Sequence, residues 1–153
     1  MKKVKNIAII AFDSHKTDLI EWSYFNKSLL MPHQITPLGF AGGILEGTLN
    51  KKLHTAETGK PGEYRQLCNR INNDEIDAVI IFGEADEVLE TKDLDAVLEI
   101  AIKKNIVVAA NRTTADFILH SSLIDENYII AKNEKKPTDK NEVFEINTSL
   151  TLA

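Results

Sequence analysis

The sequence is poor in cysteine and arginine and has no long apolar run. Its single cysteine, Cys68, excludes an internal disulfide and is typical of a reducing, cytoplasmic setting. Only three arginines and a net charge of −5 argue against a nucleic-acid partner, which would need a basic surface. No stretch approaches the roughly 18 apolar residues of a membrane span, and the N-terminal run lacks a signal-peptide cleavage pattern. We therefore expect neither nucleic acid nor membrane as a partner.

What the sequence does contain is an alternation of short apolar runs with longer amphipathic segments. The apolar runs predict strands at residues 7–12, 33–38, 78–82 and 106–110, with a brief alternating piece at 53–56. Strands that are apolar throughout belong to parallel sheets covered by helices on both faces. We expect a three-layer, doubly wound α/β sheet, mostly parallel, in one domain that spans residues 1–131.

The segments between these strands predict helices. One spans residues 15–31 and stops at Pro32, one begins after the turn at residues 39–43 and fades near Gly47, and one covers residues 63–72. Apolar residues at helical spacing between Leu94 and Ile102 predict another. Thr113 and Asp116 resemble a capping box that opens the last helix.

Residues 132–153 form a charged tail that differs from the rest of the chain. Its last part alternates apolar and polar residues with a period of two: Phe144, Ile146, Thr148, Leu150 and Leu152. This pattern predicts a strand added at an edge of the same domain, or one that pairs with another chain.

The carboxyl ends of the predicted strands are where a ligand site is expected, because helix N-termini point their unpaired N–H groups into that crevice. The residues that follow the strands are Asp13, Gly39, Thr58 with Gly59, Gly83 with Glu84, and Asn111.

These strand ends carry motifs that resemble one known family. The segments are FDSHK at residues 12–16, LGFAG at 38–42, TGKPGEY at 58–64 and NRTTADF at 111–117. They are similar, over about residues 5–125, to the methylglyoxal-synthase-like domain family. The resemblance implies a doubly wound parallel sheet, a homohexamer and a lyase that uses neither metal nor cofactor.

The family reaction eliminates phosphate from dihydroxyacetone phosphate to leave methylglyoxal. It needs a carboxylate base, a donor to the developing enediolate oxygen and a phosphate cradle. The resemblance places Tyr64 where the family has its aspartate base and Phe12 where it has a histidine. Phe40 and Ala41 stand where the cradle has threonines, and Glu90 replaces a second histidine. Glu63, beside the base position, is a possible replacement.

The candidate residues follow from this alignment and from the strand ends. Candidate catalytic residues are Glu63, Asp13 and Asp93; candidate phosphate-binding residues are Lys16, Gly39, Thr58 and Gly59. Structural roles compete with these assignments, because either aspartate can cap a helix and glycines are needed by turns. The histidines lack ligand-like spacing, so no metal site is expected.

Three interpretations stay open. The first is a catalytically weakened or inactive member of the family that binds a small anionic metabolite, such as phosphate or dihydroxyacetone phosphate. The second is an active lyase with a site rebuilt around Glu63. The third is a non-catalytic oligomeric interaction protein whose old pocket is filled by apolar residues: Phe12, Leu38, Phe40 and Tyr64.

Overall fold

The computed structural model describes residues 4–53 and 62–126, which build a four-stranded, all-parallel sheet. The strands are β1 (Asn6–Ala11), β2 (Gln34–Gly39), β3 (Ala78–Phe82) and β4 (Val107–Ala109), in the order β2-β1-β3-β4. The expected single α/β domain with a parallel sheet is confirmed. The expected boundary at residue 131, most of the piece at 53–56 and the tail fall outside the described residues.

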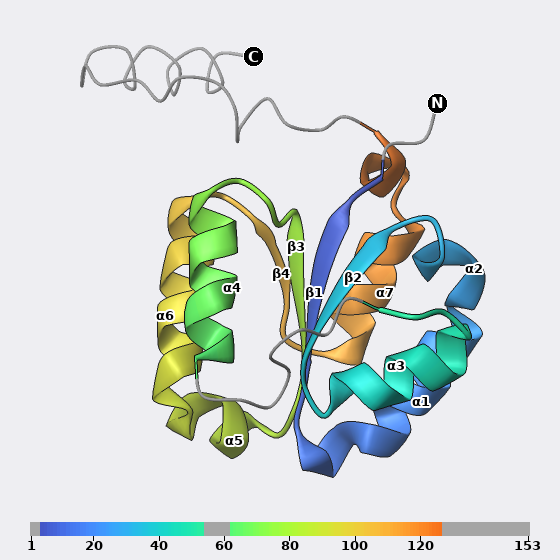
Figure 1. The fold of residues 1–153 in the computed structure, drawn as a ribbon, viewed down its shortest axis with the longest axis horizontal. Coiled ribbons are helices and arrows are strands. Elements are labelled where there is room, and N and C mark those ends of the chain that lie inside the picture. Colours follow the sequence, from blue (N-terminus) through green and yellow to red (C-terminus); the bar gives the residue numbers. More distant parts are fainter. Residues whose placement is uncertain (1–3, 54–61, 127–153) are drawn as a thin grey trace, which may run out of the picture.

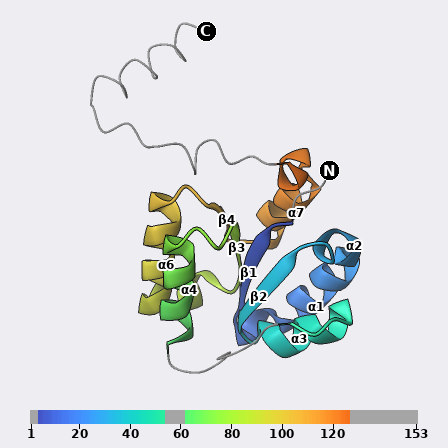
Figure 2. The ribbon, with the colours of Figure 1, turned by 45° about the horizontal axis from the view of Figure 1, so that its top comes forward.

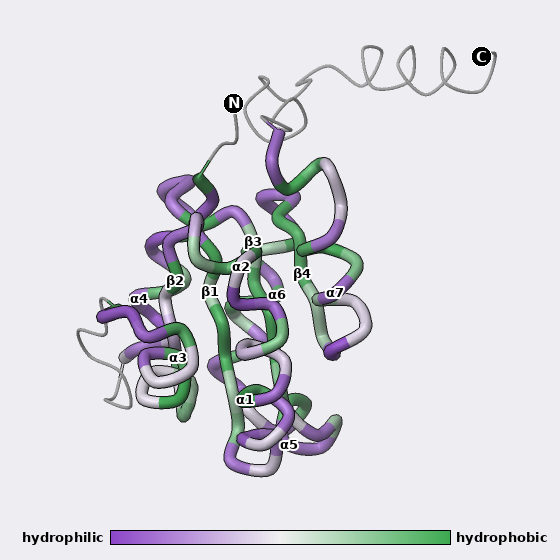
Figure 3. The backbone as a smooth tube through the Cα atoms, turned by 90° about the vertical axis from the view of Figure 1, so that its right-hand side faces the viewer, coloured by the Kyte–Doolittle hydropathy of each residue, from purple (hydrophilic) through white to green (hydrophobic). Residues whose placement is uncertain are grey.

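The central strands owe their position to uninterrupted apolar sequence. Every residue of β3 is buried, as are Ile7 to Ala11 of β1, and Figure 3 shows these strands as hydrophobic stretches of the backbone. In the register, Ile10 lies beside Leu38 on one side and Ile81 on the other. Because burying each such side chain contributes about 1.5–3 kcal/mol, this sheet centre anchors the domain.

Helices cover both faces of the sheet (Figures 1 and 2). One face carries α1 (Lys16–Phe25), α2 (Lys27–Leu30), α3 (Ala41–Leu49) and α7 (Arg112–His120), which pack on Ile7, Ile9 and Ile80. The other face carries α4 (Glu63–Asn72), α5 (Ala85–Glu90) and α6 (Lys92–Lys103), packed on Ala8, Ile10 and Ile81. Two short 3₁₀ helices, η1 (Asp13–His15) and η2 (Ser122–Asp125), complete the described elements. None of the described helices is long and apolar enough to cross a membrane.

Two predicted helices differ in length from the observed ones. The helix expected over 15–31 is interrupted at Asn26, whose side chain donates to the carbonyl of Trp22 at 3.0 Å and so competes with the helical pattern. The helix after Gly39 does not fade near Gly47. It continues to Leu49, where Asn50 ends it in the left-handed conformation with φ of 49°.

The capping box expected at Thr113 is wrong. Asn111 caps α7 instead, because its Oδ1 accepts the backbone N–H of Thr114 at 2.9 Å. Asp116 points elsewhere and accepts the indole N–H of Trp22 at 2.8 Å. A capping box does exist between Glu84 and Glu87, at the start of α5, a helix that the sequence analysis missed.

Candidate functional site

The carboxyl edge of the sheet gathers the described candidate residues. In a right-handed parallel fold each helix begins at the edge where the strands end, so η1, α3, α4, α5, α6 and α7 all start there (Figure 1). This places Asp13, Lys16, Gly39, Glu63 and Asp93 around one edge. Thr58 and Gly59 lie outside the described residues.

Gly39 ends β2 in a conformation that only glycine adopts easily. Its φ is +64°, and a Cβ atom there would lie 2.5 Å from the backbone oxygen of Ala11. The same oxygen accepts the N–H of Phe40 at 3.0 Å. The structure thus accounts for this glycine through the close approach of β1 and β2.

Glu63 makes the most informative contact at this edge. Its Oε1 accepts the backbone N–H of Gly39 at 2.9 Å, just before the N-terminus of α3. Hydrogen bonds to a charged group contribute about 1.5–3 kcal/mol. A carboxylate therefore already occupies one of the backbone donors for which the sequence analysis predicts an anion.

Lys16 lies against Phe40, the residue after Gly39, and is paired within its own turn. Its Nζ is 2.7 Å from Oδ1 of Asp13 and 4.5 Å from the centroid of the Phe40 ring. Asp13 is not a helix cap: the N-cap residues of η1 and α1 are Phe12 and His15, without side-chain cap bonds. The Lys16 and Asp13 side chains are 44% and 69% exposed, so their pair contributes at most about 1 kcal/mol.

The charges of Asp93 and Glu63 both act on Tyr64, the residue that the family resemblance aligns with an aspartate base. Burial, and then the charges of Glu63 and Asp93, raise the pKa of Tyr64 to about 12, so its phenol is a weaker acid than that of an ordinary tyrosine. Asp93 does not cap α6, because that N-cap is Thr91. Burial and Asp93 also raise the pKa of the Cys68 thiol, which weakens it as a nucleophile.

The apolar replacements in this region do not all fill a pocket. Phe12, Tyr64 and Leu38 pack with the core on the α4–α6 face. A Cβ atom built on Gly83 would lie 2.5 Å from Cδ2 of the Phe12 ring. The present position of that ring therefore requires glycine at residue 83. Phe40, in contrast, is 50% exposed and lies against Lys16.

The sequence analysis missed a polar cluster between η1 and α5. Ser14 Oγ donates to Glu87, and this bond, followed by the N–H of Glu84, lowers the pKa of the Glu87 carboxyl. His15 Nε2 lies 3.7 Å from Asp18 and 3.8 Å from Glu84. The Glu-x-x-Glu spacing at residues 84–87 was the available signal for the capping box. Within residues 4–53 and 62–126, no three His, Cys, Asp or Glu side chains form a group able to hold a metal ion.

Comparisons with known proteins agree on one family. The chain is 40% identical over 126 residues to the methylglyoxal synthase of Coxiella burnetii, covering 82% of this chain and 88% of that protein. It is 35% identical over 128 residues to the methylglyoxal synthase of Photorhabdus laumondii, covering 83% and 84%. The crystal structure of methylglyoxal synthase from Elizabethkingia anophelis matches with a TM-score of 0.72 and 26% identity, over 91% of this chain and 97% of that one. A scan against protein-family models gave no match.

Proposed function

The chain belongs to the methylglyoxal synthase family, and we propose that it is a catalytically weakened member that binds a small anionic metabolite at the carboxyl edge of its sheet. The observation that carries this proposal is the contact between the Glu63 carboxylate and the backbone N–H of Gly39. The Glu63 carboxylate is an internal anion on a backbone N–H at the end of β2, and Lys16 lies against Phe40, the next residue. Backbone N–H groups that precede a helix and a nearby cation are groups that can also hold a phosphate.

Weak catalysis follows from the groups that stand at the reacting positions. Tyr64, with its pKa raised to about 12, cannot take a proton from a substrate near neutral pH. Phe12 packs into the core and offers no donor to a developing enediolate. Binding and elimination are therefore separable here, since the anion contacts do not depend on either aromatic side chain.

An activity assay tests the catalytic part of the proposal. Purified protein should release phosphate from dihydroxyacetone phosphate at least about 100-fold more slowly than the Coxiella burnetii enzyme, following the cost of losing a general base. The second candidate function, a lyase rebuilt around Glu63 with Asp13 and Asp93, is favoured by the position of Glu63 at the strand ends. A rate close to that of the relative, abolished by Glu63→Gln, would establish that second function.

Titration calorimetry with phosphate and dihydroxyacetone phosphate tests the binding part. Lys16→Ala should weaken binding at least about fivefold, and binding should fall with salt because the lysine is partly exposed. Lys104→Ala is the matched control, because Lys104 is also ion-paired, 3.1 Å from Asp74, but lies at the other end of the sheet. No binding at about 10 mM phosphate, or equal binding by Lys16→Ala, contradicts the proposal.

Glu63→Gln separates the two candidate functions in one protein. Under the proposal, the Glu63 carboxylate competes with the ligand for the Gly39 N–H, so removing its charge should tighten phosphate binding at least about threefold. The slow elimination rate should stay unchanged. Weaker binding of phosphate by Glu63→Gln would show that the carboxylate does not compete.

The proposal includes assembly into a homohexamer, as the family resemblance implies. Light scattering at micromolar concentration should give a mass several times that of one chain. A monomer would contradict this part without affecting the binding site, whose contacts described above all lie within one chain.

A further inference from the structure

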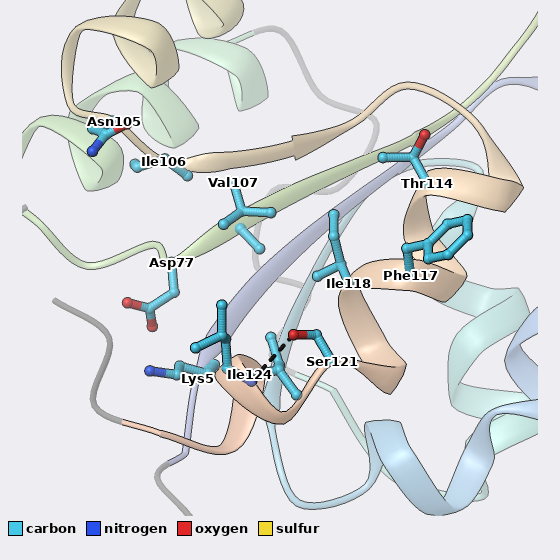
Figure 4. Close-up of a pocket in the computed structure, with 12 residues that line it drawn as sticks. Lys5, Asp77, Asn105, Ile106, Val107, Thr114, Phe117, Ile118, Ser121 and Ile124 are labelled. Carbon is cyan, nitrogen blue, oxygen red and sulfur yellow. Dashed lines mark hydrogen bonds between the residues drawn. The ribbon is translucent and has the colours of Figure 1, made fainter. Parts of the chain in front are cut away.

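A hollow lies at the opposite end of the sheet from the candidate site. It is a groove of about 470 Å³ bounded by the start of β4, by α7 and by η2. Val107 projects into it from the strand, and Phe117, Ile118 and Ile124 line it from the helical side (Figure 4). Lys5 and Asp77 lie at one end.

The groove marks a place where the core is incomplete. β4 is an edge strand of the described sheet and pairs with β3 alone among the described strands. Three large apolar side chains around the groove are unusually exposed: Phe117 by 75%, Leu123 by 46% and Val107 by 45%. Parallel strands are normally covered on both faces, and an open edge with apolar side chains invites another strand.

We propose that residues 144–152 of the same chain occupy this place, as a strand that pairs with the free edge of β4 and sets its apolar side chains into the groove. This segment alternates apolar and polar residues with a period of two, so Phe144, Ile146 and Leu150 share one face. That face matches an apolar groove, whereas Glu145, Asn147 and Ser149 face solvent.

The tail can reach the groove, because the described part of the chain ends close to it. The described part ends at Glu126, whose backbone oxygen accepts from Lys5 Nζ at 2.7 Å, and Lys5 lines the groove. Residues 127–143 then connect Glu126 to Phe144, and a linker of this length spans up to about 55 Å when extended. A segment tethered so close has an effective concentration in the millimolar range, which favours it over a second copy.

Hydrogen exchange of the full-length protein, read by mass spectrometry, tests the proposal. The double variant Phe144→Asp with Ile146→Asp should exchange at least about tenfold faster in peptides that cover β4 and α7. The matched control, Asn147→Asp with Ser149→Asp, adds the same two charges on the other face of the tail and should leave these peptides unchanged. Peptides from β1 serve as an internal reference, because β1 is buried and none of its residues lines the groove.

Three results would overturn the proposal. If the Phe144 and Ile146 double variant leaves exchange in the β4 and α7 peptides unchanged, the tail does not occupy the groove. Protection of β4 that rises between about 1 and 100 µM protein assigns the place to a second copy. Faster exchange caused by Ile129→Asp with Ile130→Asp, and not by the tail variant, assigns it to the apolar run that directly follows Glu126.

Discussion

The two ends of the sheet differ in the groups that they expose and in whether those groups have partners. At the carboxyl end, charged groups have internal partners: Glu63 bonds the N–H of Gly39, and Lys16 pairs with Asp13. At the amino end of β4, the groove exposes apolar side chains such as Phe117 and Val107. The first surface is polar and occupied by its own residues, and the second is apolar and open.

This difference shows that the groove and the anion-binding groups lie at different ends of the sheet. A small anion is held by N–H groups and a nearby cation, which the carboxyl end supplies in a shallow arrangement. The groove of about 470 Å³ is lined mainly by apolar side chains, with polar ones such as Lys5 and Asp77 at its end, and this lining suits an apolar segment with polar flanks. The function of each end therefore follows from the groups it presents and not from its size.

The largest effect at the carboxyl end of the sheet is expected for Gly39→Ala, which should destabilise the fold. The left-handed φ and the 2.5 Å approach to the Ala11 oxygen should together lower the free energy of unfolding by about 3 kcal/mol, measured by urea denaturation. Gly43→Ala is the control, because it lies within α3 and a Cβ there meets nothing within 4 Å. Gly43→Ala should be neutral or stabilising by up to about 1 kcal/mol. Equal stability of the two variants would show that the approach of Gly39 to the Ala11 oxygen is not tight.

Much of the fold could be predicted from the sequence because it depends on local pattern. The unbroken apolar run at 78–82 and the helix at 63–72 match the observed bounds of β3 and α4. The break at Asn26 was not predictable in the same way. Its side chain also bonds Asp116 and His120, which are 90 and 94 residues away in the sequence, and only the folded chain brings them together.

The sequence predicted where the candidate residues lie in the fold, but not all of the contacts that they make. The family resemblance selected Gly39, Glu63 and Lys16, and the structure places all three at the carboxyl edge. The pair of Asp13 with Lys16 has the local i, i+3 spacing that a sequence can show. The bond from Gly39 to Glu63 joins the end of β2 to the start of α4, and no spacing in the sequence encodes that contact.

A smaller and pH-dependent effect is expected at Tyr64. Its pKa is about 12 in the folded protein and near 10 when unfolded, so between these pH values the unfolded chain releases a proton that the folded chain keeps. The free energy of unfolding should therefore fall from pH 10 to 12, by less than about 2.7 kcal/mol because the phenol is partly solvated. Tyr64→Phe should lose this component of the decline, whereas Tyr24→Phe, at a side chain that is 70% exposed, should retain it. Identical alkaline profiles for both variants would mean that Tyr64 is not buried against α6.

The smallest effect on stability is expected for Lys16→Ala. A small effect would show that the charged pair at the carboxyl end of the sheet is not needed for folding. Its contacts with Asp13 and the Phe40 ring are both exposed, so the loss in free energy of unfolding should stay below about 1 kcal/mol. Lys104→Ala, which breaks the pair with Asp74, should cost a similar amount. Only Lys16→Ala should also weaken phosphate binding, because Lys16 lies at the carboxyl end of the sheet, where the anion is proposed to bind, whereas Lys104 lies at the other end. A loss of stability above about 2 kcal/mol for Lys16→Ala would show that the lysine holds η1 and α1 together. The charged groups at the carboxyl end would then have a structural role and not a ligand-binding one.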